Sequence, residues 1–453
     1  MRLRQAMFAI AMVFTAARAF ANPDVLVGGE VDPWNKKDGF DFHGYFRESV
    51  GFNSKGGGQA CFGLPGADFK ARLGNECDHY FEATFAEQQT VGSTTWRWEI
   101  MPAYGGQNFT GGGAYGAGMT QNGTEPAAVP LYIQQNWGSL NFHDAGDLKL
   151  WVGDRYTHRE NVDPFDWFFL NPFQGHDAVG VEDINLGGYG KAAFTIARMD
   201  ANFAATQLGT YMRAEARAYG VPVNPNGSIE VDLQADVPVK QSSVTGSFDT
   251  GFMITAEHNQ SNFLGGGNAL LFQYGSATAM NNGTTGPTSD SKEWRIIENL
   301  NFAFLPQISG GLFIVYQNKS YPAKAVNTAG GTADGASIIS AAIRPAYHVS
   351  DNFKLAVDVF YQSESFKDAT AGVGTPNLLK VALVPTFTLG AHDLYTRPEL
   401  RFFVTYGSWN TAASQTTLGG PGGGSGTATS LGQGAFGTDT SGASFGAQYE
   451  IWF

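Results

Sequence analysis

The sequence has few charged residues, only two cysteines and no long apolar run beyond its N-terminus. Charged residues make up 15% of the 453 residues, whereas about 25% is usual for a soluble domain. The formal net charge of −13 argues against a nucleic-acid partner, because phosphate binding needs a basic face. No later window holds 18 consecutive apolar residues, so the sequence predicts no transmembrane helix.

Aromatic residues and glycine are abundant instead. The chain has 35 Phe, 17 Tyr, 9 Trp and 59 Gly. A hydrophobic content of 43% also argues against intrinsic disorder, because such a chain can bury apolar surface.

The N-terminus has the features of a secretory signal. Residues 1–21 combine a basic start, an apolar stretch at 6–17 and Ala-Phe-Ala at 19–21. The alternative is an amphipathic N-terminal helix. We therefore expect a cleaved signal peptide, a short periplasmic segment at 22–39 and one domain at 40–453, in an exported protein that is either soluble or a membrane β-barrel.

Apolar and polar residues alternate with a period of two, and this pattern distinguishes the two classes. In residues 40–52 the even positions include Phe40, Phe42, Phe46, Val50 and Phe52, and the odd positions include Asp41, His43, Tyr45, Arg47 and Ser49. Similar alternation runs through 78–85, 393–406 and 444–453. A soluble sandwich also alternates, but its outer face would be more charged. An aromatic face opposite a face of mixed charge is typical of a transmembrane antiparallel β-barrel, and the length allows roughly 16–20 strands around an aqueous channel.

Glycine-rich and polar stretches at 105–126 and 411–442 predict long external loops. Cys61 and Cys77 lie in another such stretch, and export to an oxidising compartment favours a disulfide between them. Two free thiols are the alternative. A metal site is disfavoured, because no CxxC or histidine cluster accompanies the pair.

Residues 155–177 contain the turn signals Asp163-Pro164 and Asn171-Pro172 and yet carry the rings of Phe165, Trp167, Phe168, Phe169 and Phe173. Exposed loops do not normally present so many rings. We expect this segment to fold into the lumen and narrow it. The alternative, which is compatible with the first, is packing against neighbouring subunits.

Several ordered motifs resemble the maltoporin family. They are Asp41-Phe-His-Gly-Tyr-Phe-Arg47, Arg72-Leu-Gly-Asn-Glu-Cys77, Trp151-Val-Gly-Asp-Arg155 and Phe445-Gly-Ala-Gln-Tyr-Glu-Ile-Trp452, with shorter matches at 80–82, 256–258, 344–345 and 397–398. The resemblance implies a trimeric, 18-stranded porin of a Gram-negative outer membrane that passes oligosaccharides. It also implies a disulfide in the first external loop, a third loop that folds inward and no cofactor.

The resemblance also implies sites for the sugar. Tyr45, Tyr80, Tyr395 and Trp452 match the family's aromatic slide, and Phe263 is a possible further member. Alternation independently puts the first four on the inward, polar face. The residues that match the polar track are Arg47, Arg72, Glu82, Arg159 and Asp166. Phe168 stands where the family has a constricting tyrosine, so this chain lacks that hydroxyl.

The chain departs from the family pattern in three places. In the family, the second loop of a neighbouring subunit supplies the first tryptophan of the slide, but residues 105–128 contain no tryptophan, although Tyr115 could replace it. Gly267 falls near the place of a slide phenylalanine, and Val129 falls near the place of a track arginine. The sugar therefore stays open between maltodextrins, disaccharides, β-glucosides and other glycans.

Two other classes compete with a sugar-specific porin. A general diffusion porin is the nearer one. An enzyme such as an outer-membrane lipase is the other, but His43 and His79 are isolated rings at strand starts, and no P-loop or HExxH motif appears. We therefore predict no enzymatic activity.

Overall fold

The computed structural model describes residues 38–64, 67, 69–107, 131–171, 175–202, 208–239, 249–277, 289–327, 329–390, 392–416 and 435–453. The expected signal peptide at 1–21, all but the last two residues of the expected segment at 22–39, Tyr115 and Val129 lie outside these ranges. No helix in the described residues is long and apolar enough to cross a membrane.

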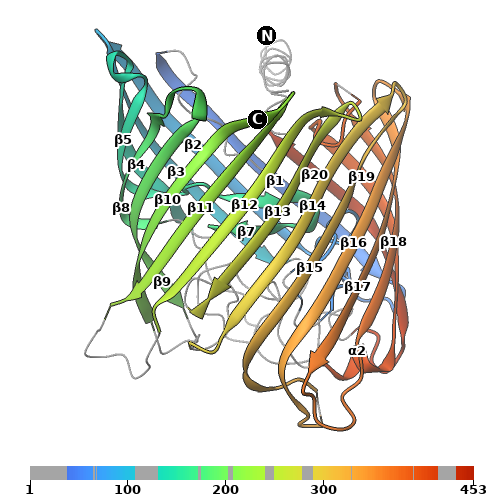
Figure 1. Ribbon diagram of the computed structural model, residues 1–453. Coiled ribbons are helices and arrows are strands. Elements are labelled where there is room, and N and C mark those ends of the chain that lie inside the picture. Colours follow the sequence, from blue (N-terminus) through green and yellow to red (C-terminus); the bar gives the residue numbers. More distant parts are fainter. Residues whose placement is uncertain are drawn as a thin grey trace.

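Within the described residues, eighteen antiparallel strands form one closed cylinder (Figure 1). The strands are β1 (Gly39–Asn53), β2 (Asp78–Val91), β3 (Thr94–Gln107), β4 (Tyr132–Phe142), β5 (Leu148–Arg155), β8 (Gly175–Asn185), β9 (Lys191–Asn202), β10 (Leu208–Asn224), β11 (Gly227–Pro238), β12 (Gly251–Phe263), β13 (Gly266–Ser276), β14 (Lys292–Leu305), β15 (Ile308–Ala325), β16 (Thr332–Ser350), β17 (Phe353–Lys367), β18 (Asn377–Thr388), β19 (Glu399–Trp409) and β20 (Ser441–Trp452). Neighbours in sequence pair, and β1 also pairs with β20, with Tyr45 opposite Trp452. The predicted β-barrel is confirmed.

The remaining elements are short. They are the hairpin of β6 (Glu160–Val162) and β7 (Trp167–Leu170), the 3-10 turns η4 (His143–Ala145), η5 (Asp163–Phe165) and η6 (Gly187–Tyr189), and α2 (Thr411–Gln415). In Figure 1 the C-terminus lies at the upper rim of the cylinder and α2 at the lower rim. The β6–β7 hairpin belongs to a loop that enters the cylinder, as the contacts below show.

Side chains alternate between the two faces of the wall as predicted. In β1, Phe40 is 69% exposed on the outer face and Arg47 is 4% exposed on the inner face. Near the C-terminus, Phe445 and Tyr449 face outward while Glu450 is fully buried. A closed sheet with a continuous apolar outer face satisfies its backbone groups internally, which a strand structure in lipid requires.

The predicted alternation over 393–406 is wrong in its first part. β18 ends at Thr388 and β19 begins only at Glu399, so residues 393–398 form no strand. The carboxylate of Asp393 accepts hydrogen bonds from the backbone N–H groups of Tyr395 and Thr396, which turns the chain. Leu394 consequently packs against the apolar cluster inside the barrel and does not face lipid.

Two external loops fill one side of the lumen. The first loop (residues 54–77) contributes Phe62 and Phe69, and the third loop (residues 156–174) contributes Phe165 and Trp167. The Phe69 ring lies 4.8 Å from that of Phe165 and 4.6 Å from that of Trp167.

These rings pack on inner-wall residues that include Phe313 and Phe360. The third loop therefore folds inward as predicted, and its rings Phe165, Trp167 and Phe169 pack within the barrel. Phe173, the fifth predicted ring, lies outside the described residues.

Candidate functional site

Three predicted slide residues form a line across the seam where the barrel closes. The Tyr45 ring on β1 lies 6.1 Å from the Tyr80 ring on β2 and 6.2 Å from the Trp452 ring on β20. All three side chains are partly exposed on the inner wall. Adjacent strands thus place three flat rings side by side facing the lumen.

The other two predicted slide residues lie apart from this line. Tyr395, in the segment between β18 and β19, donates a hydrogen bond of 3.3 Å to Asn301 on β14. Phe263 ends β12, pairs with Gly266 across a tight turn and is 45% exposed. Among the described residues, neither ring makes a ring-to-ring contact with Tyr45, Tyr80 or Trp452.

Arg397 adds a positive charge at the end of the line. Its guanidinium carbon lies 4.5 Å from the centre of the Trp452 ring, and its Nε donates a hydrogen bond of 2.6 Å to Glu450. A guanidinium over an aromatic face is attracted by the ring quadrupole, so Trp452 is held in its orientation.

Arg72, in the first loop, joins both loops to the wall. Its guanidinium donates to Glu76 (2.6 Å), Asp163 (2.8 Å), Glu450 (2.9 Å) and the hydroxyl of Tyr45 (2.7 Å). The Tyr45 hydroxyl in turn donates to Glu450. Arginine suits this position because its five donors form a rigid planar fork.

Arg47 lies in the same cluster and contacts the same Glu76 oxygen as Arg72. It pairs with Glu76 at 2.6 Å, with Asp78 at 3.0 Å and with Asp166 of the third loop at 3.7 Å. Burial alone would raise the pKa of Asp166, but the guanidinium groups of Arg72 and Arg47 outweigh it and hold that pKa below its usual value. Asp166 therefore stays ionised beside the two arginines.

Three side chains of the third loop are stacked on one another. The Arg159 guanidinium carbon lies 3.9 Å from the Tyr156 ring centre and 3.5 Å from the Phe168 ring centre. Burial raises the pKa of Tyr156 to about 12, so its hydroxyl keeps its proton at neutral pH. Phe168 is partly exposed while its neighbours Trp167 and Phe169 are buried, so it is the ring of this hairpin that reaches the lumen.

Sequence reasoning missed two tyrosines that extend the line. Tyr132, at the start of β4, is hydrogen-bonded to Tyr80, and the Tyr80 hydroxyl also donates 2.8 Å to Glu82. Tyr156 lies close enough to Tyr80 to interact electrostatically with it. A register shift between Met101 and Pro102 on β3, the partner strand of β4, disturbs the alternation that could have placed Tyr132 inside.

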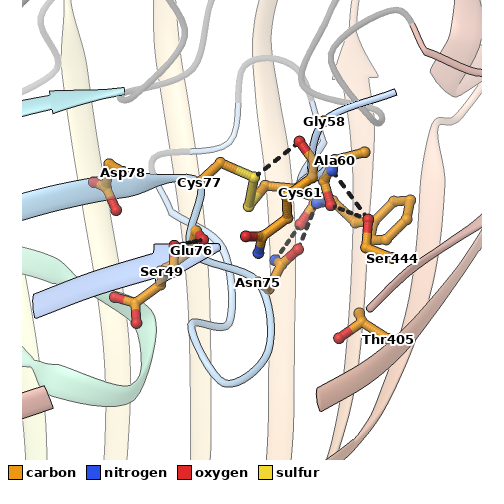
Figure 2. The surroundings of a disulfide bond; sticks show 12 residues. Ser49, Gly58, Ala60, Cys61, Asn75, Glu76, Cys77, Asp78, Thr405 and Ser444 are labelled. Atoms are coloured by element: carbon orange, nitrogen blue, oxygen red, sulfur yellow. Dashed lines mark hydrogen bonds between the residues drawn. A yellow bond between two sulfur atoms is a disulfide. The ribbon is translucent and has the colours of Figure 1, made fainter. Parts of the chain in front are cut away.

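The predicted disulfide between Cys61 and Cys77 is present, and it closes the first loop (Figure 2). Next to it, Ser444 exchanges two hydrogen bonds with the backbone of Ala60 (Figure 2). Ser444 sits in a Gly-Ala-Ser-Phe-Gly sequence, but it lies within β20 and not on the strand-to-helix turn of a hydrolase nucleophile. Its hydroxyl anchors the loop to the wall.

The two histidines considered for catalysis contact residues on their own or the neighbouring strand. His43 lies 3.1 Å from Asp41, its neighbour on β1, and the His79 ring lies 5.9 Å from that of Tyr104.

Comparison with known proteins places the chain among porins. Solved structures similar to it include an anion-selective porin from Comamonas acidovorans (11% identity, 92% of this chain, 100% of that chain, TM-score 0.39) and the outer-membrane protein OmpT of Vibrio cholerae in its trimer form (11%, 92%, 100%, 0.35). A model of the LamB porin family matches residues 40–453. The family confirms a channel of the Gram-negative outer membrane and the resemblance to maltoporins. This chain belongs to the LamB porin family.

Proposed function

We propose that this porin is selective for sugars and lets oligosaccharides diffuse along the line of Tyr80, Tyr45 and Trp452. The observation that carries the proposal is the position of these rings on the inner wall, 6.1 and 6.2 Å apart, where water and not lipid is the neighbouring medium. The apolar C–H face of a pyranose can lie on such a ring. Each ring contact contributes about 0.5–1.5 kcal/mol beyond area burial.

Several weak contacts in a row suit conduction. A few such rings hold a sugar at roughly millimolar affinity, about −4 kcal/mol. A channel site must release its solute as readily as it binds it. The line of rings therefore guides the sugar without trapping it.

The polar track divides into groups that contact sugar and groups that position others. Arg72 uses its donors on Glu76, Asp163, Glu450 and Tyr45, so we assign it a positioning role. Glu82, Asp166 and Arg159 are at least partly exposed, and we expect them to hydrogen-bond sugar hydroxyls. Arg47 is buried between carboxylates and fixes Asp166 at the channel.

We also infer that three copies assemble, as the family resemblance implies, with Phe168 and Arg159 forming the constriction of each channel. Native mass spectrometry of the detergent-solubilised protein tests the trimer. A mass of one chain under conditions that preserve conductance contradicts it.

Ion current through single channels in a planar bilayer tests sugar selectivity. We expect the current to fall with sugar concentration and to saturate for one or more members of a panel of maltodextrins, sucrose, cellobiose and other β-glucosides. Current that no sugar reduces would reject selectivity and favour a general diffusion porin. The sugar with the lowest half-blocking concentration identifies the substrate class.

A further inference from the structure

A buried histidine at the base of the third loop faces carboxylates of the barrel wall. His158 follows β5 and is 9% exposed. Its Nδ1 lies 3.4 Å from Oδ2 of Asp232 on β11 and 3.7 Å from Oε1 of Glu215 on β10. Asp232 is 0% exposed and Glu215 is 7% exposed. The three side chains come from segments 57 and 17 residues apart in sequence and meet in the barrel interior.

The opposite ring nitrogen of His158 is occupied. Its Nε2 lies 2.8 Å from Glu160 and is also in contact with Glu230. These carboxylates hold the ring by Nε2, and Nδ1 faces Asp232 and Glu215 on the opposite side. Metal-ligating histidines almost always have such a carboxylate or carbonyl on the far nitrogen.

The two carboxylates on the Nδ1 side of the ring each direct one oxygen toward His158. Oε2 of Glu215 accepts hydrogen bonds from Asn171 (2.8 Å) and Gln234 (3.2 Å), so Oε1 is the atom that faces His158. Oδ1 of Asp232 is buried and receives no hydrogen bond from a donor in the described part of the chain. An unpartnered buried carboxylate oxygen is costly, which indicates that a partner is missing.

Carboxyl groups outnumber the cationic side chains in the described surroundings of this histidine. Five buried or partly buried carboxyl groups meet around this histidine: Glu160, Glu215, Glu230, Asp232 and Glu257. Arg217 forms an ion pair with Glu230 at 2.7 Å, and Arg213 forms one with Asp236 at 2.9 Å.

Carboxyl groups contact each other in two pairs, Glu215 with Asp232 and Glu160 with Glu257. Two carboxylates in contact cannot both stay charged unless they share a proton or bind a cation.

We propose that His158 Nδ1, Glu215 and Asp232 bind one divalent transition-metal ion of the Zn²⁺ type. Donors at the usual bond lengths of about 2.0–2.2 Å lie about 3.3–3.6 Å apart along the edges of a tetrahedron. The 3.4 Å separation from Nδ1 to Asp232 lies within this range, and the 3.7 Å separation to Glu215 lies just above it. One imidazole with two carboxylates suits Zn²⁺ better than Ca²⁺, which takes six to eight oxygen ligands.

The ion ties the third loop to the wall at both of its ends. His158 lies near the start of the loop, and Asn171, which holds Glu215, lies near its end. The loop carries the Arg159–Phe168 stack. The site therefore fixes the constriction from a place outside the channel lining, and it does so whether or not the transported solute is a sugar.

Zinc content of the full-length protein in detergent tests the site. The protein is stripped with a chelator, loaded with ZnCl₂, passed through gel filtration and measured by inductively coupled plasma mass spectrometry. We expect about one equivalent of Zn²⁺ per chain in the wild type and a loss of nearly all of it in Asp232→Asn and His158→Gln. His348→Gln, which changes another buried, inward-facing histidine, is the matched control and keeps the ion.

Cobalt gives a second test that needs no variant. Co²⁺ loaded into the stripped wild type should give the intense visible absorption of a tetrahedral site, and Zn²⁺ should remove it. Retained Zn²⁺ in Asp232→Asn at the wild-type level, or a Co²⁺ spectrum identical to that of the free aqueous ion, overturns the proposal. The carboxyl pairs then share protons.

Discussion

Nη2 of Arg72 donates a hydrogen bond of 2.7 Å to the hydroxyl oxygen of Tyr45. One residue lies in the first external loop and the other in the middle of β1. The same guanidinium reaches Asp163 of the third loop and Glu450 of β20. The orientation of a ring in the channel wall is therefore coupled to the docking of both inward loops.

Arg72→Met should destabilise the barrel by about 3–5 kcal/mol, because it leaves Glu76 and Glu450 buried without this partner. Thermal unfolding followed by tryptophan fluorescence in detergent measures the change. Lys55→Ala removes the exposed Lys55–Asp439 pair and should cost only about 0–1 kcal/mol. Equal losses in the two variants would contradict the role of Arg72.

Trp452→Ala and Tyr80→Ala should each weaken sugar block roughly 2- to 10-fold, the equivalent of one lost ring contact. Titration of the current through single channels gives the half-blocking concentration. Tyr449→Ala changes a ring of β20 that is 37% exposed on the outer face, so it should leave the block unchanged. Wild-type block in both slide variants would show that the solute takes another path.

Phe168→Ala should raise the single-channel conductance, because it removes the ring that reaches into the lumen from the third loop. The loop should stay docked, since Phe165 and Trp167 keep their contacts with Phe69. Phe402→Ala, on the lipid face at 45% exposure, is the control for ring removal as such. Conductance that does not change in Phe168→Ala would place the narrowest point elsewhere.

Cys61→Ala combined with Cys77→Ala should lower stability by about 2–4 kcal/mol, because the bond closes a short loop with a sequence separation of 16. Reduction of the wild type with dithiothreitol should give the same decrease in unfolding temperature. A reduced wild type that matches the oxidised one would mean that the packing of Phe62 and Phe69 alone holds the loop.

Acid should loosen the third loop only at a pH below the ordinary pKa of an aspartate. The folded protein holds the pKa of Asp166 below its usual value of about 3.9. Its stabilising contribution is therefore fully present above the unfolded-state pKa and is lost as the pH falls through the lower folded-state value.

Conductance recorded from pH 7 to pH 3 measures this, and Asp166→Asn provides the comparison. We expect the conductance of the wild type to approach that of Asp166→Asn only at the acid end. Convergence already at pH 5 to 6 would contradict the lowered pKa.

Period-two alternation predicted the barrel and most inward side chains, because in a closed sheet each residue has only two faces available. It predicted Tyr45, Tyr80 and Trp452 on the inner wall, where the structure places them. It failed for Leu394, where Asp393 turns the chain between β18 and β19. It could not place Tyr132, because a register shift interrupts the pattern.

Contacts between distant segments could not be predicted from the sequence. His158, Glu215 and Asp232 are each unremarkable in their local sequence, and only the register of β10 and β11 against the docked third loop brings them together. The sandwich of Arg159 between Tyr156 and Phe168 similarly depends on the β6–β7 hairpin, which no periodic pattern predicts.

The pairing of Tyr45 with Trp452 joins the first and last strands of the chain. These two rings become neighbours only when the last strand finds the first, at the final step of forming a cylinder. An incompletely assembled barrel thus has Tyr45 and Tyr80 at one free edge and Trp452 at the other. Under the proposed function, sugar recognition appears only with ring closure, so a ligand-binding assay would also report on how many molecules in a preparation have completed assembly.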